Sequence, residues 1–108
     1  MLLDTDPDAA CSRAYYAMFY AARAALLHAG QAQAAMAKTH AGVISAFGEH
    51  LVKSQLIDAE HGRSFAKVER ERLVADYSGD GISGDAATIA LKRADEFLSA
   101  VKHWMAQS

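Results

Sequence analysis

The chain has 108 residues and a formal net charge of −2, which fits one domain of ordinary size. Hydrophobic residues make up 52% and charged residues 22%, so we expect a packed core and exclude global disorder. The acidic balance argues against a broad basic surface for duplex nucleic acid, although a dimer cleft can still concentrate a few arginines around a phosphate. We expect no leader segment, because the first three residues meet Asp4 at once, without a basic region or an apolar region. Because the longest strongly apolar run, residues 14–22, is too short to span a bilayer, we expect a soluble cytoplasmic protein.

The sequence indicates no metal site and no cofactor. Cys11 is the single cysteine, and the five histidines are scattered, so no paired spacing for zinc exists. The alanine-rich surroundings of Cys11 predict a small core residue rather than a reactive thiol.

A first helix is predicted from Pro7 to Ala29. Asp6 suits the N-cap, proline suits the first helical position, and Gly30 suits the C-terminal stop. The segment between them is apolar on nearly all sides, which is typical of a central helix contacted by several neighbours.

Three further helices are predicted after a stretch, residues 31–37, that we expect to be a loop or a frayed helix end. Thr39 is the expected N-cap of a second helix that runs to about Lys53, and Asp58 caps a third that ends near Tyr77. The later turns of the third helix carry the apolar residues Phe65, Val68, Leu73 and Val74.

The last helix is predicted to follow the glycine-rich loop of residues 78–84, with Ser83 or Asp85 as its N-cap. Its apolar positions recur at helical spacing on one side. No window shows the alternation of a strand. The sequence therefore predicts an all-α fold, an up-and-down bundle of about four main helices, with residues 1–108 as a single domain.

The third helix holds the first candidate site residue. At helical spacing Ala66, Arg70, Leu73 and Tyr77 fall on one stripe, which places an arginine among apolar neighbours. Such a charge needs a partner, which can be a carboxylate, a second subunit or a phosphate. An ion pair to Asp76 and a ligand-binding role both stay open for Arg70.

Charged neighbours on the same helix have a simpler interpretation. We expect Glu69 and Arg72 to form a solvated face of the third helix. Glu71 is also interpreted mainly as surface charge, with an alternative role in orienting Arg70 of a second subunit.

The start of the second helix is a second candidate. Lys38, Thr39 and His40 lie where free backbone N–H groups favour an anion, so they can bind a phosphate. The alternative is that Thr39 only caps the helix and His40 packs against an aromatic ring. Among the clustered aromatics of the first helix, Tyr15 and Phe19 are predicted to be core residues, and Tyr16 or Tyr20 to reach an interface.

Two segments, Ser12–Arg23 (SRAYYAMFYAAR) and Lys38–Gly48 (KTHAGVISAFG), together resemble HEPN-domain proteins, the higher eukaryotes and prokaryotes nucleotide-binding family. His61-Gly62-Arg63 and Ala75-Asp76-Tyr77 fit the small prokaryotic branch, and the resemblance covers about residues 8–105. It implies an all-α bundle, usually a homodimer. Many such proteins are ribonucleases, often toxins paired with a nucleotidyltransferase, and others are non-catalytic RNA- or nucleotide-binding modules.

The chain departs from the HEPN pattern at its start. Family members commonly carry a long helix ahead of the Ser-Arg-Ala-Tyr-Tyr segment, and here only residues 1–7 precede the first helix. We therefore expect a bundle that lacks most of this helix. The apolar surface so uncovered would be buried against a second chain.

The second departure concerns catalysis. Nuclease members carry an arginine, a polar residue and then a histidine, often followed by x-Tyr. In the matching positions this chain has Arg70, Glu71, Ala75 and Tyr77. Alanine cannot transfer a proton, so ribonuclease activity is expected to be weak or lost, unless His40 replaces the missing histidine.

The first hypothesis is a dimeric HEPN-type RNA- or nucleotide-binding protein, a component of a toxin–antitoxin pair with weak or lost metal-independent ribonuclease activity. The alternative is a non-enzymatic dimerisation or adaptor module for a protein partner such as a nucleotidyltransferase. A third possibility is a small regulator that binds a soluble nucleotide. The predicted catalytic residues are Arg70 and His40, and the predicted binding residues are Arg70, Glu71, Asp76, Tyr77, Lys38, Thr39 and His40.

Overall fold

The computed structural model describes residues 6–108, and within this range the chain is helical without strands. The elements are α1 (Pro7–His28), α2 (Ala32–Ala35), α3 (His40–Phe47), the π-helical turn η2 (Gly48–Val52), α4 (Ala59–Ser78) and α5 (Gly84–Gln107). The all-α prediction is confirmed. No helix in the described range is long and apolar enough to cross a membrane. The predicted absence of a leader concerns residues 1–5, which lie outside that range.

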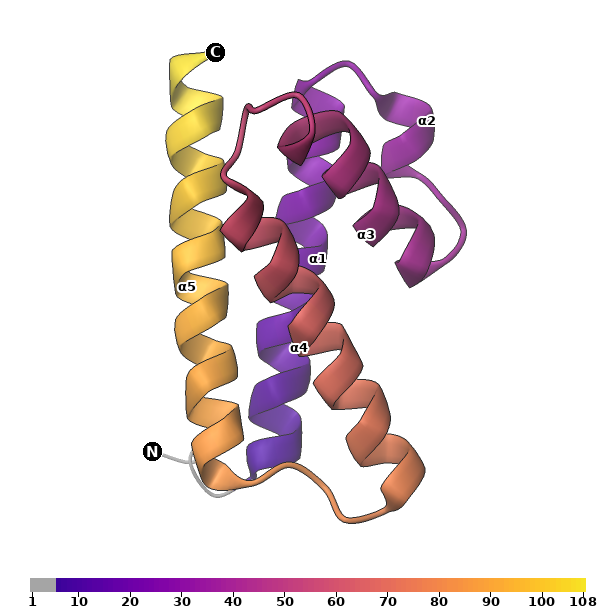
Figure 1. Ribbon diagram of the computed structural model, residues 1–108, viewed down its shortest axis with the longest axis vertical. Coiled ribbons are helices and arrows are strands. Elements are labelled where there is room, and N and C mark those ends of the chain that lie inside the picture. The colour runs from indigo at the N-terminus through magenta and orange to yellow at the C-terminus, as the bar shows by residue number, and fades with distance from the viewer. Residues whose placement is uncertain (1–5) are drawn as a thin grey trace.

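Helix α1 is the centre of the bundle, as its apolar circumference predicts. It contacts α2, α3, α4 and α5. Figure 1 shows α1 and α5 running lengthwise in the same direction, while α4 crosses in the opposite direction and α2 and α3 cover the upper end of α1. The middle of α4 therefore lies against both α1 and α3.

The predicted helix starts are confirmed by their capping hydrogen bonds. The side chains of Asp6, Asp58 and Ser83 each accept a hydrogen bond from a first-turn backbone N–H, at 3.2, 2.8 and 3.0 Å respectively. Gly79 ends α4 with a φ of 74°, a left-handed conformation that glycine adopts without steric cost. The loop that follows is fixed to the start of α1, because the Ile82 backbone N–H donates to the Asp8 carboxylate at 2.6 Å.

The core combines aromatic and small side chains from every main helix. The rings of Phe47, Phe65 and Phe97 lie 5.0–5.9 Å apart and join α3, α4 and α5. Cys11 is a buried core residue, as predicted. The largest fully buried side chains are Tyr15, Phe47, Phe65, Phe97, Met18, Leu26, Leu51, Val43, Val68 and Cys11.

Two local features differ from the expectations. Within residues 31–37 a short helix, α2, forms instead of a loop. Arg23 of α1 fixes it, because the Arg23 Nε donates to the Ala35 carbonyl at 3.1 Å. The second predicted helix has the expected length, but beyond Phe47 it widens into the π-helical turn η2, which begins at Gly48.

Candidate functional site

Helix α4 turns a different face to the core from the one its sequence was expected to bury. Its buried residues are Phe65, Val68 and Ala75, whereas Arg70 and Tyr77 are exposed, Tyr77 to 93%. Arg70 makes no ion pair with any residue between 6 and 108, so the predicted pairing with Asp76 is wrong.

Of the apolar residues in the later turns of α4, Leu73 and Val74 are 43% and 59% exposed. Arg72 lies on the buried stripe of α4. It is about 200° around the helix from Arg70, so the two arginines project to opposite sides of the helix.

The residues expected to form a solvated face, Glu69 and Arg72, are instead largely buried. The Glu69 and Arg72 side chains are only 12% and 15% exposed. The Arg72 Nε and Nη2 donate to the Glu69 Oε1 at 3.1 and 2.8 Å. The Arg72 guanidinium carbon lies 4.7 Å from the ring centroid of Tyr15 and 5.6 Å from that of Tyr16, within range of cation–π attraction. Arg72 is therefore the arginine of α4 that sits among aromatic groups.

His40 completes this cluster from the start of α3. Thr39 caps the helix, since its Oγ1 accepts a hydrogen bond from the Gly42 N–H at 2.9 Å. The His40 ring centroid lies 4.8 Å from that of Phe19. Its Nδ1 lies 3.5 Å from the Glu69 Oε2. His40 thus packs against aromatic rings, as predicted by the alternative in which Thr39 only caps the helix. His40 also contacts a carboxylate.

We call Tyr15, Tyr16, His40, Glu69 and Arg72 the Glu69 cluster, because one carboxylate contacts both the arginine and the histidine. Burial alone would lower the pKa of Arg72, but the hydrogen bonds and charge of Glu69 outweigh it and raise that pKa. Burial, followed by the charge of Glu69, raises the pKa of Tyr15 far above its ordinary value. The cluster therefore holds a fixed cation and a neutral phenol, and its carboxylate can orient the imidazole.

Arg70 lines a separate feature, an open hollow of about 530 Å³ between the end of α4, the loop after it and the start of α5. Lys67, Glu71 and Ala75 also line the hollow. Neither Lys67 nor Arg70 makes an ion pair in the described part of the chain. Two cations without ion pairs thus border the position where the nuclease pattern would have its histidine, and the carboxylates of Glu71 and Asp80 line the same hollow.

The predicted site residues therefore separate into distinct places. The hollow contains Arg70 and Glu71, while His40 belongs to the Glu69 cluster with Thr39 beside it. Asp76 and Tyr77 are exposed near the end of α4 and do not line the hollow, and Lys38 is exposed ahead of α3.

Comparison with known proteins identifies the family. The HEPN domain profile matches residues 1–104. The chain belongs to the HEPN domain family. Relatives of this HEPN chain include a UPF0332 protein of Gloeobacter violaceus, 36% identical over 102 residues that cover 93% of the chain and 78% of the relative. A UPF0332 protein of Thermotoga maritima is 30% identical over 95 residues, covering 86% and 68%.

A Methanocaldococcus jannaschii protein that carries the name "Putative toxin" is 36% identical over 93 residues, which cover 86% of this HEPN chain and 66% of the relative. The chain thus spans about two thirds of the length of that protein. No solved structure matches the chain.

The sequence analysis missed Glu69 and Arg72 as members of a built cluster. The signal was present in the spacing, because Phe65, Val68, Arg72 and Ala75 recur at i, i+3, i+7 and i+10 and so form one stripe. That stripe competes with the one through Arg70, and helical spacing alone does not say which one faces α1.

Proposed function

We propose that this HEPN chain is an RNA- or nucleotide-binding protein that acts as a component of a toxin–antitoxin pair. The observation that carries the proposal is the hollow beside Ala75, where Lys67 and Arg70 present two cations without ion pairs. Cations held without ion pairs can bind phosphate groups even in a chain of net charge −2 and with Glu71 and Asp80 lining the same hollow. The "Putative toxin" name of a relative supports the toxin part of the proposal.

Ribonuclease activity is proposed to be weak or lost. Ala75, in the expected histidine position, has no group that can transfer a proton. The imidazole of His40 is the candidate replacement, and its contact with Glu69 can hold it in one orientation. Cleavage would then use the 2′-hydroxyl of the RNA as nucleophile, with an arginine stabilising the charge on the phosphate. Because Glu69 and Arg70 project about 100° apart on α4, we expect His40 and Arg70 to act on one phosphate only across two protomers.

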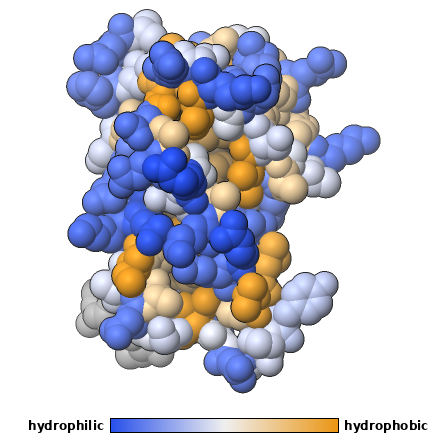
Figure 2. Space-filling view, in the orientation of Figure 1, coloured by the Kyte–Doolittle hydropathy of each residue, from blue (hydrophilic) through white to orange (hydrophobic). Residues whose placement is uncertain are grey.

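A homodimer is proposed on the basis of exposed apolar groups. Leu73, Val74 and Tyr77 of α4 are all exposed, Tyr77 almost completely. Figure 2 shows apolar groups around the region where α4 ends and α5 begins, below a band of hydrophilic side chains. Exposed aliphatic and aromatic groups gathered in one region are typical of a protein interface.

The proposal is tested by incubating a mixed RNA pool with purified protein in EDTA and measuring both binding and cleavage. We expect the wild type to bind RNA and Arg70→Ala to lose that binding. Lys53→Ala is the matched control, because Lys53 is an exposed cation on another part of the surface, paired with Glu49. Equal binding by the wild type and Arg70→Ala would contradict the proposal. If the loss of the histidine explains weak cleavage, Ala75→His should increase the cleavage rate.

The alternative function is a non-enzymatic adaptor for a protein partner such as a nucleotidyltransferase. The exposed apolar residues of α4 favour it, because they provide an interface without any need for RNA. A stable dimer that binds no RNA, and whose dimerisation is lost on Leu73→Ser, would support this function over the first.

A further inference from the structure

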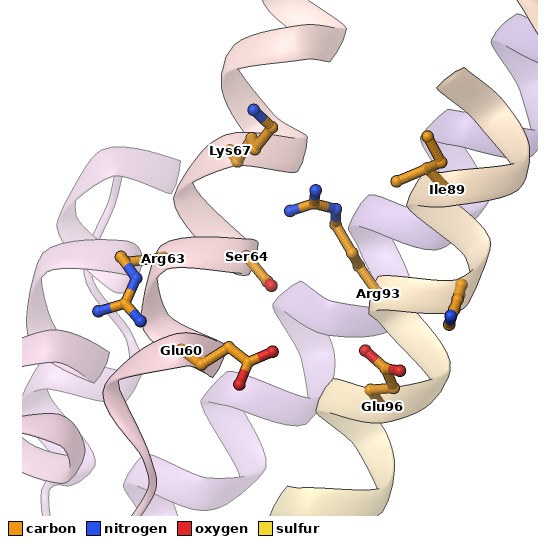
Figure 3. Close-up of a pocket in the computed structure, with 8 residues that line it drawn as sticks. Glu60, Arg63, Ser64, Lys67, Ile89, Arg93 and Glu96 are labelled. Atoms are coloured by element: carbon orange, nitrogen blue, oxygen red, sulfur yellow. The ribbon is translucent and has the colours of Figure 1, made fainter. Parts of the chain in front are cut away.

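A second hollow of about 550 Å³ lies along the groove between α4 and α5. Figure 3 shows Ser64 and Lys67 projecting into it from α4 and Arg93 reaching across from α5. Lys92 also lines this groove, while Glu60 and Glu96 lie at its opposite end. We call this feature the α4–α5 groove. Arg63 also lines the groove near Glu60, so the groove carries four cations and two carboxylates, and both carboxylates lie toward the start of α4.

Three cations of the α4–α5 groove have no carboxylate of the described residues within ion-pair distance. Lys67, Lys92 and Arg93 make no ion pair with another residue in the range 6–108. The Arg93 Nε is also shielded from solvent, and no hydrogen-bond acceptor for it exists among the described residues. A buried donor without a partner costs free energy, and so do like charges held close together. An anion between Lys67 and Arg93 would remove the cost of the like charges by contacting the lysine ammonium and the terminal guanidinium nitrogens of Arg93.

The α4–α5 groove and the hollow of the proposed function share one lining residue, Lys67. Arg70 follows Lys67 by one turn of α4, about 4.5 Å along the helix axis. The cations thus form a row from Arg70 through Lys67 to Arg93 and Lys92. Two open hollows that meet at one lysine suit an extended chain with repeated charges better than a single enclosed nucleotide.

We propose that the α4–α5 groove binds the sugar–phosphate backbone of single-stranded RNA, with Lys67 and Arg93 holding one phosphate and Arg70 the next. The inference rests on the proposed RNA binding and gives that binding a path across the surface. The guanidinium of Arg93 matches two phosphate oxygens, and the Ser64 hydroxyl can donate to the same group. Glu60 and Glu96 limit the path, because they repel a strand that extends toward the start of α4.

The test is a salt titration of binding to a fluorescent oligouridylate, measured by anisotropy. Each lost phosphate contact should reduce the slope of log K against log salt by about 0.7, which corresponds to about a fivefold loss of affinity at 0.1 M salt. We expect this reduction for Lys67→Gln and for Arg93→Gln. Lys102→Gln is the matched control, because it removes an exposed cation of α5 that does not line the groove.

A variant with the opposite expected effect guards against loss of folding as an explanation. Glu96→Gln removes a carboxylate from the groove and should strengthen binding of the oligouridylate. Uridine monophosphate, added as a competitor, should displace the labelled strand far less effectively than unlabelled oligouridylate, because it occupies one phosphate position only.

The outcomes separate this inference from the proposed function. Binding that is lost in Arg70→Ala but keeps its affinity and slope in Lys67→Gln and Arg93→Gln would overturn the path along the groove and leave the proposed function intact. Equal competition by the mononucleotide would overturn the extended site. A wild-type protein that binds no oligouridylate would overturn both proposals.

Discussion

Removing the charge of Glu69 is the sharpest perturbation of the Glu69 cluster. In Glu69→Gln the side chain keeps its size, but Arg72 loses the carboxylate that accepts two of its hydrogen bonds at 2.8 and 3.1 Å. The Arg72 side chain is only 15% exposed, so solvent replaces little of the lost interaction. Breaking a fully buried pair costs about 3–5 kcal/mol, and an exposed pair is worth about 0.2–1 kcal/mol. Both hydrogen bonds of this nearly buried pair end on the Glu69 Oε1, and the glutamine amide oxygen can still accept them, so we expect an intermediate loss of about 2 kcal/mol from the missing charge.

The assay is thermal unfolding followed by circular dichroism. In a domain of this size a loss of 2 kcal/mol lowers the Tm by roughly 8–16 °C. Glu49→Gln is the matched control, because its pair with Lys53 has the same chemistry but side chains that are 62% and 74% exposed. That control should change the free energy of unfolding by less than about 0.5 kcal/mol.

A double-mutant cycle with Arg72→Met isolates the interaction between the two charges. The coupling energy should account for most of the loss in Glu69→Gln. If Glu69→Gln and Glu49→Gln lower the Tm equally, the Glu69 cluster does not hold α4 in place and the reasoning is refuted.

Three further predictions concern burial and backbone conformation. Because the pKa of Tyr15 is raised in the folded protein, the free energy of unfolding should fall as the pH rises above about 10, by up to about 1.4 kcal/mol per pH unit. Chemical denaturation at several pH values measures this fall. Tyr15→Phe should remove the fall in stability, and Tyr20→Phe should not. Cys11 is buried, and burial is the main cause that raises its pKa, so a disulfide reagent should label the thiol only as fast as the protein opens. Labelling faster than the amide exchange of the core would contradict this prediction. Gly79→Ala should destabilise by about 1 kcal/mol because its φ is 74°, whereas Gly84→Ala, in open space at the start of α5, should be neutral or slightly stabilising in the same unfolding assay.

The fold could be predicted because its helix boundaries are encoded locally. Asp6 with Pro7, Asp58 and Ser83 are side chains that complete a helix end by their own hydrogen bonds, so their positions mark the boundaries without tertiary information. The short helix α2 was missed for the opposite reason, because its anchor is a contact from Arg23, twelve residues earlier than Ala35.

The candidate site was predicted less well, because its geometry depends on which side of α4 faces α1. The spacing is compatible with a stripe through Arg70 and with one through Arg72, and only packing against Tyr15 distinguishes them. The Glu69 side chain could be placed near Arg72 from the i, i+3 spacing, but its contact with His40 joins two helices that no local rule brings together.

The most direct test of RNA binding by this protein is to record amide chemical shifts of the isotope-labelled protein while an oligouridylate is added. The account predicts concentration-dependent shifts for residues 64–75 of α4 and 86–93 of α5, with little change for the turn η2, which lines neither hollow. Shifts confined to other helices, or none at all at saturating RNA, would contradict it.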